Sequence, residues 1–406
     1  MSTEVRAESS STTWSNRLVF FTWWSRWQSQ VEGWPRNRRL LLLVGAILLG
    51  ATAHFWAQTL PPNWDFYQWD NTATALLEGR DPYVEFGYNY TPIWLLILGA
   101  LKWISSDQQS FRLLISVVLF LVNIWIVVLL SRRGYSLAAA FFILSPIVIA
   151  INGQHQQADS IALALALAAM LYANKESAER IVPADIVAVV LLGLSLSVKQ
   201  IFIVLPLWLA FRPGPIRRRL LYLFAPPAIF LGFLGAAMLT FNPRYVFEEV
   251  LLHGSGANSP LVLTLVPHQL APWVLENRLS LVLSLALLIP TGLLFRRLPP
   301  FEMTLVYTVA ALLFAWGVAN QYLLIPVAAV GVFMNIGFLL WVLGASFYLA
   351  GAPYPDGLSL PLLNQAHPHV FLEWFWMGRD LFPYLLLGAV ILSVWTRRRD
   401  YSPPRA

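Results

Sequence analysis

The chain has 406 residues, of which 58% are hydrophobic and 12% are charged, and its mean hydropathy is +0.62. Soluble domains carry roughly 25% charged residues, and a soluble core of this size would not bury so much apolar surface. The composition excludes a soluble enzyme and predicts an all-α polytopic membrane protein. The absence of Cys excludes disulfides, thiolate-held zinc and thiol nucleophiles. In a membrane protein, a net charge of +6 indicates basic residues that set the orientation in the membrane. No nucleic-acid partner is therefore expected.

Residues 1–39 are polar, basic and rich in Trp, with Trp23, Trp24 and Trp27 close together. Indole rings favour the membrane interface. The segment is therefore predicted to be a cytoplasmic amphipathic element at the membrane surface. It lacks an apolar stretch followed by a small-residue cleavage site, and we expect no removable signal peptide.

A single transmembrane domain is predicted over residues 40–396, because each membrane crossing requires about 17–25 mostly apolar residues. The apolar segment Pro92–Ile104 is too short to cross and is predicted to be a re-entrant or interfacial helix. About twelve spans are expected, at 40–57, 111–130, 136–151, 159–173, 182–198, 200–212, 219–240, 279–295, 302–318, two within 321–351 divided at 335–337, and 380–396.

The basic residues indicate the orientation of these spans. With both termini in the cytoplasm, 20 of the 27 Lys and Arg fall in inner segments, which include the tail 397–406. The other seven fall outside, mainly in the loops 58–110, 241–278 and 352–379, as the positive-inside rule predicts. No internal repeat is visible, whereas transporters often contain one. Function is therefore predicted at the outer face.

The first outer loop places two carboxylates beside aromatic residues: Asp65 and Asp70 accompany Trp64 and Tyr67. Burial against aromatic rings raises a carboxyl pKa, which suits a general base facing a sugar hydroxyl. Asp65 is the candidate base, and the other three are candidates for binding the acceptor or the sugar. The alternative is a solvated loop in which Asp70 caps a short helix over 71–78.

The connection between the third and fourth spans is polar, from Asn152 to Asp159. Polar groups at membrane depth are costly and usually line a cavity. Gln154, His155 and Asp159 are therefore candidates for donor binding. The alternative is a hairpin turn in water.

Lys199 and Gln200 lie between two apolar runs on the outer face. An ammonium there suits a phosphate at headgroup level, although a snorkelling Lys is the alternative. Arg244, in the loop 241–278, is a possible helper. Gln321 and Tyr322 begin another crossing on the same face, where they are either donor-pocket residues or an interfacial anchor.

Together these motifs resemble the GT-C superfamily of membrane glycosyltransferases, which use polyprenyl-phosphate-linked sugars. The most similar members are the mannosyltransferases of GPI-anchor assembly, their bacterial relatives, and glycosyltransferase family 87. The resemblance covers about residues 40–325 and rests on four segments, which occur in the order of the family. The first is an early Asp followed by a Gly-x-x-Pro-Tyr-like turn and a Tyr-Pro-Pro-like helix start (Asp65, 79–83, 90–92), and the second is a Gly-Gln-x-Asp-like hairpin (153–155 and Asp159). The third is a Lys-Gln before an apolar span that contains a Pro (199–200, Pro206), and the fourth is a Gln-Tyr-Leu-Leu-like start of a late span (321–324). Two departures are Thr91 in place of the second Pro and three residues that separate Gln154 from Asp159.

The resemblance implies an inverting transfer of a hexose, with mannose the commonest case, to a lipid or glycan acceptor. Asp65 would be the general base, and Lys199, helped by Arg244, would meet the charge of the leaving phosphate. The donor pocket would be lined by Gln154, His155, Asp159, Gln200, Gln321 and Tyr322. We expect no metal and no other cofactor, although some members of the superfamily use a divalent cation. The implied location is the extracytoplasmic face of a bacterial plasma membrane.

Three alternatives stay open at this point. A lipid or solute transporter or flippase would place ionisable residues in mid-span and show symmetry between its halves. A non-catalytic scaffold for glycan assembly would tolerate replacement of Asp65. An oligosaccharide polymerase or ligase on the same fold is not distinguished from monosaccharide transfer by the sequence.

Overall fold

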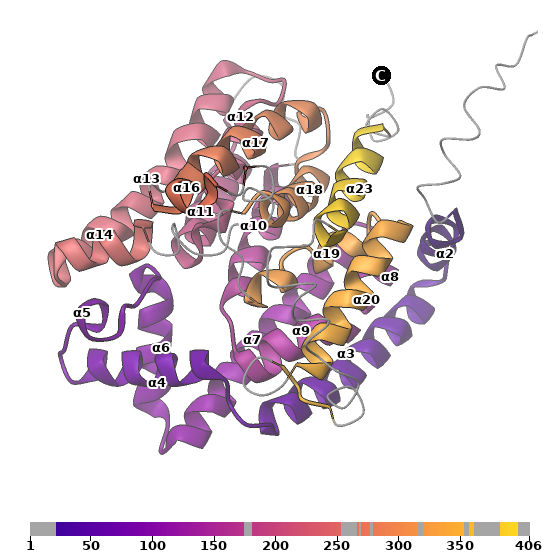
Figure 1. Ribbon diagram of the computed structural model, residues 1–406. Coiled ribbons are helices and arrows are strands. Elements are labelled where there is room, and N and C mark those ends of the chain that lie inside the picture. The colour runs from indigo at the N-terminus through magenta and orange to yellow at the C-terminus, as the bar shows by residue number, and fades with distance from the viewer. Residues whose placement is uncertain are drawn as a thin grey trace, which may run out of the picture.

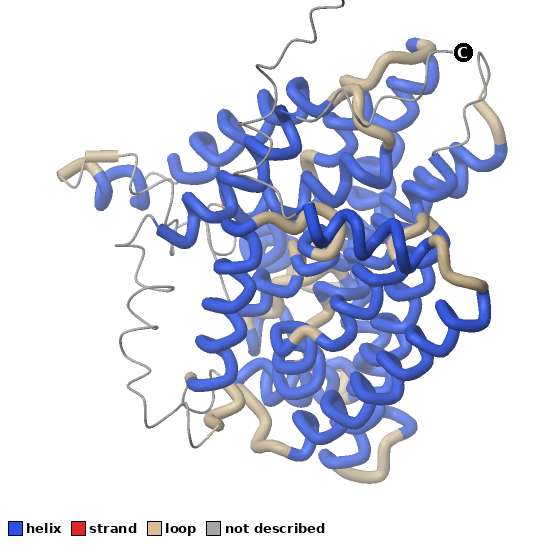
Figure 2. Tube along the Cα trace, turned by 90° about the vertical axis from the view of Figure 1, so that its right-hand side faces the viewer, coloured by secondary structure: helices blue, strands red, loops and turns tan. Residues whose placement is uncertain are grey.

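The computed structural model describes residues 22–173, 181–252, 266–267, 269–276, 279–315, 320–352, 357–360 and 382–396. Within these ranges the chain is mostly helical and contains no β-strand (Figure 2). The predicted all-α class is therefore confirmed. The tail 397–406 and most of the loop 352–379 lie outside the described residues.

The helices form one bundle (Figure 1). Most are α-helices, whereas η2 is a π-helix and η3 and η4 are 3₁₀-helices. In chain order they are α2 (Thr22–Glu32), α3 (Arg36–Thr59), α4 (Trp64–Leu77), α5 (Pro82–Phe86), α6 (Pro92–Ile104), α7 (Gln108–Arg132), α8 (Ser136–Leu144), α9 (Pro146–Val148), η2 (Ile149–His155), α10 (Asp159–Ala173), α11 (Pro183–Val198), η3 (Gln200–Phe202), α12 (Leu205–Ala210), α13 (Ile216–Thr240), α14 (Pro243–Leu252), α16 (Ala271–Glu276), α17 (Leu279–Phe295), α18 (Pro300–Leu313), η4 (Asn320–Leu324), α19 (Val327–Val330), α20 (Ile336–Gly351) and α23 (Phe382–Thr396).

Three of these helices, α3, α7 and α13, are long and apolar enough to cross a membrane alone. A fourth candidate is the pair formed by α8 with the segment Pro146–His155, which bends by 48°. The bend lies at a Pro, whose ring and missing N–H interrupt a helix. Most other predicted spans correspond to apolar helices of 10–17 residues. Candidate membrane spans are thus present, while the expected number of twelve is not established by length and composition.

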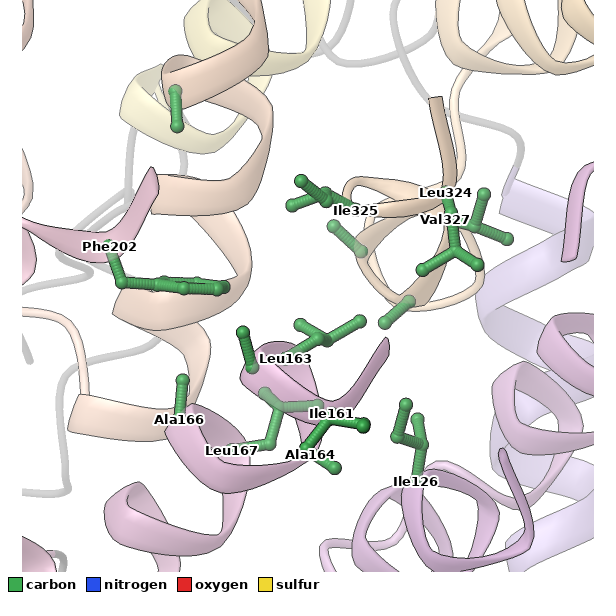
Figure 3. Packing of buried hydrophobic residues seen from close by; sticks show 14 of the residues in the cluster. Ile126, Ile161, Leu163, Ala164, Ala166, Leu167, Phe202, Leu324, Ile325 and Val327 are labelled. Carbon is green, nitrogen blue, oxygen red and sulfur yellow. The ribbon is translucent and has the colours of Figure 1, made fainter. Parts of the chain in front are cut away.

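The centre of the bundle is largely apolar. Every residue of α18 is buried, as is typical of a helix that is mainly apolar on all sides. Helix α10 packs between α7, α11 and α18. Figure 3 shows Leu163 and Leu167 of α10 among Phe202, Ile325 and Ile126, which come from three other segments of the chain.

The outer surfaces of α3 and α13 are also apolar. Leu41 and Leu48 of α3 are 72% and 63% exposed, and Leu239 of α13 is 91% exposed. Such contiguous apolar exposure is unusual for a soluble monomer. These faces fit contact with lipid chains.

The two ends of the bundle differ in chemistry. One end carries three ion pairs, Arg39–Glu32, Arg133–Glu302 and Arg218–Asp185, and is called the basic end. Asp185 lies in the first turn of α11, whereas Lys199 directly follows the last residue of that helix. The opposite end, called the Lys199 end, also holds α4, α5 and α6, far from α2 and α23 in Figure 1.

The loop regions contain more helix than expected. Helix α4 begins at Trp64 because the side chain of Asn63 caps it, accepting a hydrogen bond from the Phe66 N–H at 3.2 Å. Asp70 therefore lies inside a helix, and its alternative role as a cap for 71–78 is wrong. The loop 241–278 likewise includes α14 and α16.

The predicted amphipathic element near the N-terminus is a helix over its described part, α2. Its Trp27 is 56% exposed, but Trp24 is only 8% exposed. The Trp24 Nε1–H donates to the Gly331 carbonyl at 2.8 Å. Helix α2 is therefore fixed to the bundle through one Trp and presents another at its surface.

Candidate functional site

Lys199 is buried at the junction of α11 and η3, with 6% of its surface exposed. Its Nζ donates to the Tyr90 hydroxyl at 2.7 Å and to Asp159 Oδ2 at 3.4 Å. The ammonium also lies 4.4 Å from the centre of the Tyr90 ring and 5.0 Å from that of Tyr322. Two aromatic rings and one carboxylate thus surround a desolvated cation, an arrangement that stabilises its charge. We call Lys199, Asp159, Tyr90 and Tyr322 the Lys199 centre.

Asp65 lies beside this centre, in the first turn of α4. Burial raises the pKa of its carboxyl group above the ordinary range, even though a hydrogen bond from Asn63 and the positive charge of Lys199 act to lower it. The Asn63 Nδ2 donates to Asp65 Oδ2 at 2.8 Å. The negative charge of Asp159 and the amide of Gln157 also act on this pKa. Asp65 therefore shares one electrostatic environment with Lys199 and Asp159.

The turn Tyr90–Pro92 fastens α6 to the end of α11. The Thr91 hydroxyl donates to the Ser197 carbonyl, and the Tyr83 hydroxyl donates to the Tyr90 carbonyl at 3.0 Å. Asp81 begins the helix that carries Tyr83, because its carboxylate accepts from two N–H groups of that helix. The sequence motifs around Pro82 and Pro92 thus hold Tyr90 in place over Lys199.

The polar hairpin between η2 and α10 is buried rather than exposed to water. Gln156 adopts a left-handed conformation, with φ of 59°, which is strained for a residue other than Gly. Hydrogen bonds hold it there: its side chain donates to the Arg112 carbonyl and to Ser116 Oγ, both at 2.8 Å, and its carbonyl accepts from Trp69 Nε1. The alternative of a solvated hairpin turn is therefore wrong.

Several polar atoms of this hairpin have no hydrogen-bond partner among the described residues, although their side chains are 0–1% exposed. Buried polar groups are nearly always paired, with protein, water or ligand. The unpaired atoms are Asn152 Oδ1, Gln154 Oε1, both ring nitrogens of His155, Gln156 Oε1, Asp159 Oδ1 and, in the first turn of α10, Ser160 Oγ. All of these atoms except the Asp159 oxygen belong to neutral side chains. Asp159 also belongs to the Lys199 centre, so the hairpin adds neutral donors and acceptors beside that centre.

Other predicted site residues make contacts of their own. The two carboxylate oxygens of Asp70 accept from Lys102 at 2.6 Å and Gln108 at 2.9 Å, which ties α4 to α6 and α7. Gln200 donates to the Val250 carbonyl at 3.1 Å. Arg244 pairs with Glu248 and its side chain is 79% exposed. These contacts do not bring Asp70, Gln200 or Arg244 to the Lys199 centre.

The remaining candidates lie at its edge or outside it. Gln154 donates to the Gly357 carbonyl at 3.0 Å. Gln321 is partly buried and precedes Tyr322 in η4. Trp64 and Tyr67 of α4 are 71% and 41% exposed, so their rings are available to a ligand at the surface.

Sequence reasoning missed two residues of the site. Tyr90 was part of a motif but was not a candidate, and Gln157 was passed over within the hairpin. The hydroxyl of Tyr90 accepts from Lys199 and donates to Gln157 Oε1 at 3.4 Å, so it joins the cation to the hairpin. The sequence signal that could have identified Tyr90 is its position two residues before Pro92, which begins the short helix α6.

Among the described residues, no group of three or more His, Cys, Asp or Glu side chains is arranged to hold a metal ion. Comparison with known proteins adds no family to this picture: no protein-family model matches the chain, and no curated protein matches its sequence.

Proposed function

We propose that the chain is a multi-pass membrane glycosyltransferase that transfers a hexose from a polyprenyl-phosphate-linked donor to a lipid or glycan acceptor. The observation that carries this proposal is a carboxylate of raised pKa, Asp65, next to a buried cation, Lys199. A base for the acceptor hydroxyl and a cation for the leaving phosphate are the two charged groups that such a transfer requires.

In the proposed reaction the acceptor hydroxyl attacks the anomeric carbon and loses its proton to Asp65. The bond from that carbon to the phosphate oxygen breaks, and the electron pair leaves with the polyprenyl phosphate. Lys199 then meets the added negative charge. Its contact with Asp159, at 3.4 Å, is longer than the roughly 2.7–2.9 Å of a strong charged hydrogen bond. In the proposal the ammonium exchanges this longer contact for a phosphate oxygen and keeps its hydrogen bond to the Tyr90 hydroxyl.

The sugar is assigned to the buried hairpin. Its unpaired amide oxygen, imidazole and hydroxyl groups at Gln154, His155 and Ser160 match the neutral donors and acceptors of sugar hydroxyls. The exposed rings of Trp64 and Tyr67 lie on the same helix as Asp65 and are assigned to the acceptor. Mannose is the first sugar to test, on the resemblance to mannosyltransferases.

The proposal includes a bacterial plasma membrane, about twelve spans, both termini in the cytoplasm and the Lys199 end outside. The asymmetry of Lys and Arg supports this orientation. A lipid-linked donor would enter along the apolar helix α6, which follows Tyr90 directly.

The decisive experiment measures transfer of radiolabelled mannose from polyprenyl-phosphate-mannose into membrane lipids, for wild type and Asp65→Asn at matched expression. Wild type is expected to transfer label, and Asp65→Asn to be slower by about 10²–10⁴-fold. Glu248→Gln is the control, because it removes an outer carboxylate that pairs with Arg244 on the surface. Transfer by Asp65→Asn at the wild-type rate would remove Asp65 from its role. Absence of transfer from a panel of lipid-linked sugars would favour the transporter or scaffold.

A further inference from the structure

A hollow of about 280 Å³ lies at the basic end, lined by Leu293, Leu294, Arg296, Arg297 and Trp395. It joins the end of α17 to the last turn of α23, which both pack against α18. A water molecule takes up roughly 30 Å³ in the liquid, so the hollow has room for several water molecules or for a phosphate group that carries a glycerol unit. It lies at the opposite end of the bundle from the Lys199 centre.

The lining of the hollow is divided into a charged part and an apolar part. Arg296 and Arg297 are exposed just after α17, and neither forms an ion pair within the described part of the chain. Leu293 and Leu294, in the last turn of α17, are 46% and 49% exposed. Two guanidinium groups therefore adjoin an apolar surface, with an indole on the facing helix.

This division matches one class of molecule. Guanidinium groups bind phosphate oxygens through paired hydrogen bonds, and exposed leucines at the end of a span contact acyl chains. Trp side chains favour the same headgroup level. Basic hollows between helices on the cytoplasmic side of membrane proteins bind anionic lipid headgroups. We propose that this hollow binds the phosphodiester headgroup of an anionic phospholipid, independently of the reaction at Asp65.

The test uses the full chain, purified in a neutral detergent, with native mass spectrometry to count bound lipid after addition of phosphatidylglycerol or phosphatidylcholine. Wild type is expected to retain phosphatidylglycerol about tenfold more strongly than phosphatidylcholine. Arg296→Gln/Arg297→Gln is expected to lose this tenfold preference, because both lipids carry a phosphodiester but only phosphatidylglycerol has a net negative charge, which the two guanidinium groups attract. The matched control is Arg36→Gln/Arg38→Gln, which removes two exposed arginines at the same end.

The unfolding temperature provides a second readout, because a ligand that binds the native state raises it. Phosphatidylglycerol is expected to raise it in wild type and in the control, and not in Arg296→Gln/Arg297→Gln. Equal retention of phosphatidylglycerol by all three proteins would overturn the proposal. Displacement of phosphatidylglycerol by inorganic phosphate alone would overturn it as well, because the site would then hold a free anion rather than a lipid.

Discussion

The carboxyl group of Asp65 determines the pH dependence expected of the reaction. A general base must be ionised, so the rate should rise with pH through the pKa of Asp65, which burial holds above the usual value of about 3.9. Asn63→Ala removes a hydrogen bond that lowers this pKa. We expect the rising limb of the pH–rate profile to move to higher pH in Asn63→Ala. A flat profile, or a shift to lower pH, would contradict the assignment.

The same residue is expected to lower the stability of the folded chain. An acid whose pKa is raised on folding binds more protons in the native state, so stability falls as pH rises between the unfolded and folded pKa values. Asp65→Asn should therefore unfold at a higher temperature than wild type at pH 7, and the difference should vanish near pH 4. Thermal unfolding in detergent at both pH values measures this. Equal unfolding temperatures at pH 7 would show that the carboxylate is well solvated.

Lys199 and Asp159 depend on each other. Lys199→Met leaves a carboxylate that is 0% exposed without its ion pair, which typically costs about 3–5 kcal/mol. Adding Asp159→Asn removes the unpaired charge, and most of the lost stability should return. Sugar transfer should stay low in both variants, because the cation is absent from each. Recovery of transfer in the double variant would exclude Lys199 as the phosphate-binding group.

At the scale of the helix, the hairpin depends on a close approach between η2 and α3. A side chain at Gly153 would place its Cβ 2.7 Å from the His54 carbonyl oxygen and 2.9 Å from the Ala57 Cβ. Gly153→Ala should therefore displace η2, at a cost of about 1–3 kcal/mol, and reduce transfer. Gly235→Ala in α13 is the control, since nothing lies within 4 Å of its added Cβ. Unfolding temperature and transfer rate of both variants provide the comparison.

The helices were predictable to different degrees. Apolar length alone predicted α10 over 159–173 and α17 over 279–295, and both ranges agree with the structure. The π-helix η2 and the start of α4 were not predicted. Helix α4 begins where the Asn63 side chain caps the Phe66 N–H, and η2 includes Gly153, which lies too close to the His54 carbonyl for a side chain. Side-chain contacts of this kind leave no periodic pattern in the sequence.

The pairing of site residues was harder to predict than their positions. Asp65, Asp159 and Lys199 were all predicted as site residues. The structure pairs Asp159 with Lys199 at 3.4 Å, and the charges of both act on the carboxyl group of Asp65. Asp70 was predicted to bind the acceptor or the sugar but pairs with Lys102, since five positions along a helix turn its side chain to another face than that of Asp65. Asp70 pairs with Lys102 because α4 packs against α6. This packing cannot be predicted from the residue types alone.

At the scale of the whole molecule, charge distinguishes the two ends more clearly than shape. The arginines that the sequence assigned to the inner side include Arg39, Arg133 and Arg218, and the structure gathers these three at the basic end, each paired with a carboxylate. Lys199, assigned to the outer side, lies at the opposite end. The prediction of two chemically distinct ends could be made from sequence because it depends only on the order of spans and charges.

The orientation of the ends in the membrane can be tested with single cysteines, because the chain contains none. Asn37 and Gln109 are exposed second residues of α3 and α7, which begin at the basic end and at the Lys199 end respectively. An impermeant maleimide should label Gln109→Cys in intact cells and Asn37→Cys only after permeabilisation. The parent chain, without Cys, should stay unlabelled. The reverse pattern would place Asp65 in the cytoplasm, where a donor presented on the outer face would not reach it.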